Sequence, residues 1–180
     1  GDFVVTVAGP NVEGMIAGRG SGAANYARKH YATVMNIDIG GGSANCAVFQ
    51  QGNFVDSSAM SFGGRIIEIQ GSQISHINKI GQILIDYGEL KLTIGDKPSI
   101  EDLRKVTDLM AELTIHLIQG TSNPLADKLY QSRLTSTYSN NVPLMITGGI
   151  GYYFYNPKII RSVNDVSVHG DIGPLLAESL

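Results

Sequence analysis

The stretch DIGGGS, which begins at Asp38, combines residue types that bind phosphate. Gly40, Gly41 and Gly42 have no side chains, so they permit positive φ angles and let another group approach the main chain. Successive N–H groups in such a turn form a nest that favours an anion, and Ser43 adds a hydroxyl. Asp38 places a carboxylate where it could hold a divalent cation through water. This stretch therefore predicts a phosphate site.

Other phosphate-binding loops do not match the sequence. The pattern G-x-x-x-x-G-K-[ST] occurs nowhere in the chain. The glycines are also consecutive, and a strand rather than a helix is expected after them, which excludes a dinucleotide fingerprint. On these residues alone, a tight hairpin that binds no ligand stays open as the alternative.

A second glycine cluster, Gly148 and Gly149 after Thr147, also follows an apolar stretch. The flat or sugar part of a ligand could lie against this bare main chain, and a plain strand-to-helix turn fits the residues equally well. For the pair Gly63–Gly64 we expect a bulge or a turn. The glycines around Arg19 predict a flexible loop with a solvated charge.

The hydrophobic pattern predicts the elements that position these loops. Strands are expected over residues 3–8, 34–40, 43–50 and 53–62, with 63–70 forming or entering a further strand. Residues 142–151 are expected to form a strand that runs into a glycine turn. The short turn at 51–53 favours an antiparallel hairpin. Helices are expected over 22–30, after a glycine-rich loop, then over 79–87, from Ser99 as N-cap to about 119, over 125–133, and from Asp171 or Gly173 onward. The order predicts an α/β fold with an antiparallel strand meander.

Composition limits the class of protein. The chain has 180 residues, of which 43% are hydrophobic, so it can build a real core. Its net charge of −3 and the lack of a basic cluster argue against nucleic acid and anionic membranes as partners. There is no apolar run long enough to span a membrane. The chain has no initiating Met and begins on an expected strand, so we predict an internal piece of a longer protein.

Several reactive residue types are interpreted structurally. The four histidines show no metal-binding spacing, and His116 is expected to be packed or at an edge. Cys46 is the single cysteine, so no internal disulfide can form and a reducing, cytoplasmic location is expected. We interpret Cys46 as a small buried hydrophobe. The aromatic run at 152–155 is interpreted as helix packing.

DIGGGSANCAVFQQGNFVDSSAMSFGG together with the later ITGGIG resembles the actin, Hsp70 and sugar-kinase ATPase superfamily. More narrowly, four stretches resemble the ethanolamine ammonia-lyase reactivating factors: GDFVVTVAGPNVEGMIAGRGSGA, NIDIGGGSAN with SFGGRIIEI, ITGGIG, and HGDIGPLLAESL. These stretches are spread over the whole chain. The first and last are more specific than the glycine loop, which the superfamily shares.

The resemblance implies one lobe of an actin-like ATPase (ribonuclease H-like) with a mixed sheet. Residues 1–180 would carry the second phosphate hairpin and the adenosine loop, and a region at about 70–135 would be a helical elaboration. It also implies an ATP-dependent chaperone that releases damaged cobalamin from ethanolamine ammonia-lyase, an adenosylcobalamin enzyme. Association with a bacterial microcompartment stays open.

The resemblance also implies roles for individual residues. Asp38 would lie near Mg2+ and its waters. The β- and γ-phosphates of ATP would be held by Gly40, Gly41, Gly42 and Ser43. Adenosine and the α-phosphate would lie against Gly148 and Gly149.

Two departures from the superfamily pattern matter. Ala44 stands where many relatives have a second hydroxyl, and Arg65 stands where Hsp70-like members carry an acidic residue, which leaves the adenine pocket undefined. A partner phosphate hairpin is also missing from these residues. We therefore expect the 180 residues alone to bind ATP weakly and hydrolyse it negligibly.

Two other functions remain open at this stage. One is a small-molecule kinase of the same superfamily, which would need an acceptor pocket with its own catalytic Asp. The other is a structural module, either filament-forming like actin or docking on a larger enzyme.

Overall fold

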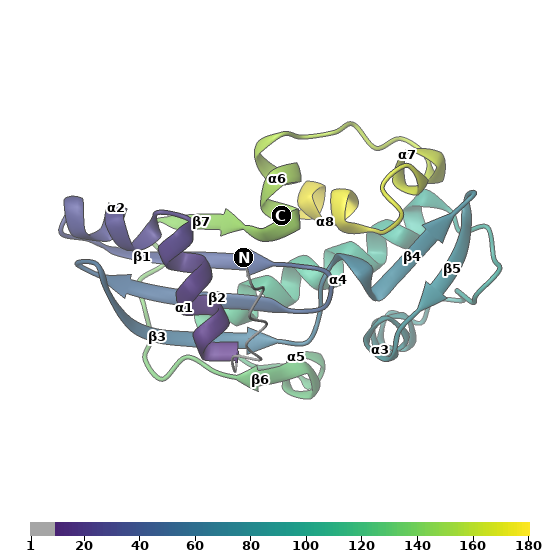
Figure 1. Ribbon diagram of the computed structural model, residues 1–180. Helices are drawn as coiled ribbons and strands as arrows, with labels where there is room; N and C mark the ends of the chain where they lie inside the picture. Colours follow the sequence, from purple (N-terminus) through teal and green to yellow (C-terminus); the bar gives the residue numbers. More distant parts are fainter. Residues whose placement is uncertain (1–9) are drawn as a thin grey trace, which may run out of the picture.

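The computed structural model describes residues 10–180, so the strand expected at 3–8 lies outside the described residues. A mixed five-stranded sheet is flanked by helices on both faces (Figure 1). Its strand order is β6-β3-β2-β1-β7. The strands are β1 (Thr33–Ile39), β2 (Ala44–Gln50), β3 (Asn53–Met60), β6 (Tyr130–Ser132) and β7 (Leu144–Thr147). The expected α/β class with an antiparallel meander is confirmed.

The hairpins β1–β2 and β2–β3 form as expected from the strand pattern. Both pairs are antiparallel. The turn between β2 and β3 has Gln51 at φ 52° and Gly52 at φ 90°, and two positive φ angles are typical of a type I′ turn. β7 instead runs parallel to β1, with Asp38 opposite Thr147. The ends of β1 and β7 therefore meet at the same edge of the sheet.

One face of the sheet is covered by α1 (Pro10–Gly20) and α2 (Ala23–Lys29) (Figure 1). The flexible glycine-rich loop predicted around Arg19 is wrong, because most of that segment is helical. The glycines serve close packing: a Cβ added at Gly18 would lie 2.2 Å from Cε2 of Phe49 on β2. Gly22, at φ 88°, separates the two helices.

The opposite face packs on α4 (Ile100–Gln119), which begins as predicted at Ser99. The Ser99 side chain accepts a hydrogen bond from the N–H of Asp102 at 3.0 Å. Further along the helix, the carbonyl of Leu117 accepts from the Ser58 hydroxyl of β3 at 2.7 Å, which ties helix to sheet. Gly120 ends the helix in the left-handed conformation.

A second, two-stranded sheet holds β4 (Ile67–Gln70) and β5 (Gln73–Ile77), beside α3 (Lys79–Tyr87). The strand expected near 63–70 is therefore confirmed, but it does not join the main sheet. Buried residues of both sheets and of α3, α4 and α8 belong to one hydrophobic cluster. The two sheets thus share a core.

The remaining helices are α5 (Pro124–Leu129), α6 (Gly148–Tyr155), α7 (Val163–Ser167) and α8 (Gly173–Ser179). The helix predicted over 125–133 is too long, because Tyr130 turns extended and its segment pairs with β3. The helix start predicted near Gly173 is confirmed. The prediction that the aromatic side chains at 152–155 pack within the protein is mostly wrong, since Tyr152 and Tyr155 are each 61% exposed on α6. Within the described residues, no helix is both long and apolar enough to cross a membrane.

Candidate functional site

The glycine loop between β1 and β2 presents bare main chain. The N–H of Gly40 donates to the carbonyl of Ser43 at 3.0 Å, whereas the N–H groups of Gly41, Gly42 and Ser43 have no hydrogen-bond acceptor among the described residues. None of the three glycines has a positive φ, so the loop does not use the left-handed conformation that glycine permits. A Cβ at Gly40 or Gly42 would meet no atom within 4 Å. The loop therefore leaves free donors and open space beside them.

The pair Gly63–Gly64 lies directly against this loop. The N–H groups of Gly64 and Arg65 donate to the carbonyls of Gly40 and Gly41 at 2.9 and 2.8 Å. A Cβ at Gly63 would lie 2.5 Å from the carbonyl oxygen of Gly40, closer than any side chain allows. The sequence predicted a turn here, and the turn is confirmed as a short 3₁₀ helix, η1 (Gly64–Ile66). Its packing against the glycine loop is the additional finding.

Both main-chain groups of Gly64 are hydrogen-bonded. Besides its N–H bond to Gly40, its carbonyl accepts from the N–H of Ile172 at 3.2 Å, just before α8. The backbone carbons also approach closely, since a Cβ at Gly64 would lie 3.0 Å from Cα of Gly173. Three segments far apart in sequence are thus joined at one point.

Asp38, the last residue but one of β1, lies beside the glycine pair at 148–149. The Thr147 hydroxyl donates to Asp38 Oδ1 at 3.1 Å and accepts from Asn36 Nδ2 at 3.0 Å. Gly148, at φ 76°, is pressed against the same strand end, where an added Cβ would lie 2.4 Å from the Ile39 carbonyl oxygen. Asp38 Oδ2 has no hydrogen-bond partner within residues 10–180. One carboxylate oxygen is therefore oriented by the protein, and the other remains available.

A cavity of about 340 Å³ opens between these segments. Its lining comes from the glycine loop, η1, α6 and the segment leading into α8. The lining residues are Gly40, Gly41, Gly64, Arg65, Gly149, Ile150, Tyr153, His169, Asp171 and Gly173. Much of this wall is main chain, so polar N–H and C=O groups face the cavity.

Polar side chains occupy the far wall of the cavity. The Tyr153 hydroxyl and His169 Nδ1 are 3.2 Å apart, and their rings meet edge to face. Burial raises the pKa of Asp171, which the Gly173 N–H bond and the nearby Arg65 cation partly offset. Burial also raises the pKa of Tyr153, so this phenol stays protonated at neutral pH.

The residues expected from the sequence to bind ligand are brought together only in part. Gly40, Gly41 and Gly149 line the cavity, whereas Asp38 and Gly148 do not line it but lie against each other where β1 and β7 end. Gly42 and Ser43 belong to the same loop but do not line the cavity. Their N–H groups are nonetheless unpaired within the described part of the chain.

Thr147, Tyr153, His169 and Asp171 were not assigned to a ligand site from the sequence, and Arg65 was noted mainly as a departure. The one usable signal was Thr147, because a hydroxyl directly before a glycine pair stands opposite Asp38 once the strands are paired. The roles of Tyr153 and Asp171 depend on tertiary packing.

Other expectations concern residues away from this cavity. Cys46 is fully buried as predicted, and burial, with the nearby Asp56 carboxylate, raises the pKa of its thiol to about 12. His116 is mostly packed, as predicted; its Nδ1 lies 2.7 Å from the Thr121 hydroxyl. Within residues 10–180 no cluster of three or more His, Cys, Asp or Glu could hold a metal ion.

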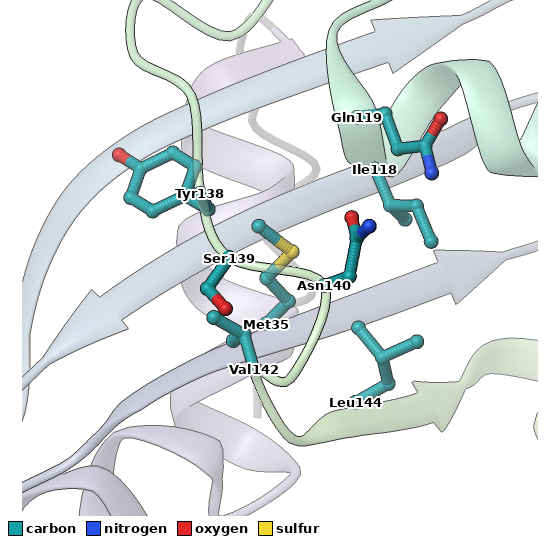
Figure 2. Close-up of a pocket in the computed structure, with 8 residues that line it drawn as sticks. All are labelled: Met35, Ile118, Gln119, Tyr138, Ser139, Asn140, Val142 and Leu144. Atoms are coloured by element: carbon teal, nitrogen blue, oxygen red, sulfur yellow. The ribbon is translucent and has the colours of Figure 1, made fainter.

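A second cavity, of about 110 Å³, lies toward the other end of β1 (Figure 2). Met35, Ile118, Val142 and Leu144 form its apolar side, and Tyr138, Ser139 and Asn140 lie on the loop before β7. None of the glycine clusters lines it. Its small volume does not suit a nucleotide.

Fold and site together define a class: an α/β protein whose mixed sheet carries a main-chain-lined cavity at the edge shared by β1 and β7. This architecture is compatible with a nucleotide-binding lobe. The sequence model described as "Ethanolamine utilisation protein EutA" matches residues 1–180. The chain belongs to this family, which confirms the resemblance found in the sequence.

Two curated relatives carry the same printed name, "Ethanolamine ammonia-lyase reactivase EutA". The chain is 37% identical over 182 residues to the protein of Escherichia coli strain K12. It is 34% identical over 181 residues to the protein of Salmonella typhimurium strain LT2. In both comparisons all of this chain is covered, and it spans 38% of the relative's length.

Proposed function

We propose that this chain is part of the nucleotide-binding domain of a factor that uses ATP to reactivate ethanolamine ammonia-lyase. The observation that carries the proposal is the cavity at the end of β1, where Gly40, Gly41 and Gly149 present bare main chain. The names of the two relatives support the reactivating role. The actin-like architecture is part of this proposal, and the mixed sheet is compatible with it.

The residues present fit the phosphate end of a nucleotide. Three successive N–H groups, those of Gly41, Gly42 and Ser43, lack protein acceptors within the described residues, and unpaired donors of this kind bind anions. The space above Gly40 and Gly42 is free of protein atoms. We assign the β- and γ-phosphates to this loop, and the adenosine side to Gly148 and Gly149.

Asp38 is the residue that would hold Mg2+ through water. Its Oδ1 is fixed by the Thr147 hydroxyl, and its Oδ2 has no partner in the described part of the chain. Mg2+ retains several waters and binds through one or two carboxylates together with phosphate oxygens. A single oriented carboxylate therefore suffices when the nucleotide supplies the remaining ligands. Bound Mg2+ would neutralise charge on the phosphates.

The partner in this proposal is ethanolamine ammonia-lyase. Nucleotide binding and hydrolysis would drive the release of damaged cobalamin, so that fresh adenosylcobalamin can enter the lyase. Because the described residues contain one phosphate hairpin, we assign the second to another part of a longer protein. A half-site provides only part of the electrostatic stabilisation that phosphoryl transfer needs.

The test adds one methyl group where only a ligand would meet it. In the full-length protein, Gly40→Ala should leave thermal stability unchanged, because no atom lies within 4 Å of the new Cβ. It should lower ATP affinity by roughly ten-fold or more, since a hydrogen bond to a charged group contributes about 1.5–3 kcal/mol and about 1.4 kcal/mol corresponds to a tenfold change in affinity. Isothermal titration calorimetry measures the binding. Reactivation of cobalamin-inactivated lyase should fall in parallel.

Gly20→Ala is the matched control, because Gly20 also has open space at its Cβ position but lies at the end of α1. It should bind ATP and reactivate the lyase like the unmodified protein. Equal ATP affinity in both variants would contradict the assignment of the loop. ADP formation that depends on an added sugar would instead favour a small-molecule kinase.

A further inference from the structure

Arg65 is held across the glycine loop by its own backbone. Its N–H donates to the carbonyl of Gly41 at 2.8 Å. Its aliphatic stem lies over the same glycine, since a Cβ at Gly41 would come within 3.1 Å of Arg65 Cδ. The absence of a side chain at Gly41 thus makes room for the stem. The position of the arginine relative to the loop is set by main chain, not by a flexible surface contact.

The charged end of Arg65 is not satisfied by protein. Its guanidinium makes no hydrogen bond to any described residue, and its nearest carboxylate oxygen, Asp171 Oδ2, is 3.7 Å from Nε. The Arg65 side chain is 73% exposed. An exposed ion pair at this distance contributes little to stability. The guanidinium therefore retains its donors for another acceptor.

Asp171, in contrast, is fixed. Its Oδ1 accepts from the N–H of Gly173 at 2.9 Å, and its side chain is only 22% exposed. It faces Arg65 from the segment that leads into α8, and His169 lies in the same wall. A fixed carboxylate at this distance can attract the exposed guanidinium of Arg65 without binding it tightly.

We propose that Arg65 binds the terminal phosphate of the nucleotide at the glycine loop and that Asp171 is its partner when no nucleotide is present. Among the described residues that line the cavity, Arg65 is the only arginine or lysine. A guanidinium can bind phosphate through two parallel N–H···O bonds, which are shorter and stronger than its 3.7 Å contact with Asp171. Nucleotide binding then replaces the ion pair between Arg65 and Asp171 with one between Arg65 and the terminal phosphate. This inference rests on the proposed function.

The experiment compares ATP and adenosine binding to the full-length protein by calorimetry. Arg65→Ala should weaken ATP binding by roughly ten-fold or more, the usual effect of losing a charge-assisted hydrogen bond. Adenosine, which has no phosphate, should bind with unchanged affinity. Arg65→Lys should recover part of the loss, because it keeps the charge but not the planar fork. Asp171→Asn keeps the Oδ1 acceptor for Gly173 and should tighten ATP binding, since the competing charge is removed.

Arg133→Ala is the matched control: Arg133 also pairs with an aspartate, Asp127, but does not line the cavity. It should bind ATP normally. Unchanged ATP affinity in Arg65→Ala, or equal losses for ATP and adenosine, would overturn the inference. The first result would leave the proposed nucleotide site standing. If the unmodified protein binds no ATP, the proposed function itself fails, and this inference fails with it.

Discussion

The backbone at Gly148 is tightly constrained by its surroundings. It combines a φ of 76° with contact to the carbonyl of Ile39 and to Asp38. Any other residue there would have to adopt a left-handed conformation and displace main chain. Both demands act at the junction of β7 and α6, beside the carboxylate that we assign to Mg2+.

We predict that Gly148→Ala lowers the free energy of unfolding by more than about 2 kcal/mol. The left-handed conformation alone costs an L-residue roughly 1–2 kcal/mol, and the 2.4 Å approach to the Ile39 oxygen adds to it. Urea denaturation followed by circular dichroism measures the change. Gly149→Ala, one residue on, has no atom within 4 Å and should unfold at the unmodified midpoint. Equal midpoints for both variants would show that the turn relaxes freely.

At the scale of residues, the sequence identified the glycine clusters of the site better than the contacts that its side chains make. Glycines that follow an apolar strand indicate close approach or an open loop, so the clusters at 40–42 and 148–149 were identifiable. The Thr147–Asp38 hydrogen bond joins residues 109 positions apart and depends on the register of two parallel strands. The position of Arg65 depends on η1 packing against the loop. Residue types alone contain neither register nor packing.

At the scale of elements, α1 depends on small residues facing the sheet. The Cβ position of Gly14 is 3.7 Å from the Cβ atoms of Asn45 and Ala47. A Cβ at Gly18 would lie only 2.2 Å from Cε2 of Phe49. Phe49 is fully buried in the cluster between α2 and the sheet, so its ring has nowhere to move. The close approach of α1 to β2 therefore requires a residue without a side chain at position 18.

We expect Gly18→Ala to destabilise the protein by about 1–3 kcal/mol, because an added methyl in a packed core forces helix and ring apart. Gly20→Ala, in the same helix with open space around it, should be neutral or slightly stabilising, since alanine favours helix. Thermal unfolding by calorimetry measures both. A Gly18→Ala variant as stable as Gly20→Ala would mean that α1 is not closely packed on β2.

The strands were predicted well and α1 was not, for physical reasons. β1 and β2 are short, strongly apolar segments bounded by turn residues, and those features indicate strands without any tertiary information. α1 contains three glycines over Pro10–Gly20, which lower helix propensity and suggested a loop. Burial against the sheet outweighs that propensity. Tertiary contact therefore decides the conformation of this segment.

At the scale of the whole molecule, the core around the central strands is shielded from solvent. Cys46 lies on β2, the middle strand of the sheet, with no exposed surface. Burial raises the pKa of its thiol to about 12, so the reactive thiolate is almost absent at neutral pH. The thiol becomes reactive only when the sheet opens.

We predict that a thiol-alkylating reagent at about pH 8 does not label Cys46 in the folded protein, because it needs the thiolate. Labelling should rise with denaturant in step with the loss of ellipticity, as unfolding returns the pKa toward its ordinary value. Mass spectrometry measures the labelled fraction. The folded-state pKa is raised, so this group's contribution to stability is present below the ordinary thiol pKa and is lost as the pH rises toward about 12. Rapid labelling without denaturant would contradict the burial.

The α/β class and the hairpins followed from strand pattern and turn residues. The separate β4–β5 sheet did not, because its segment reads as strand whichever sheet it joins. Its placement follows from contacts with α3 and the shared core, which arise only on folding.

The two main-chain hydrogen bonds of Gly64 have one further consequence. Its N–H bonds the Gly40 carbonyl, and its C=O receives the N–H of Ile172, which immediately precedes α8. These two groups belong to neighbouring peptide planes that meet at Cα of Gly64, so the loop is connected to the start of α8 through two main-chain hydrogen bonds and the φ and ψ torsions of one residue. The start of α8 is thus connected to the glycine loop through the main chain of Gly64 alone, without any side chain between them.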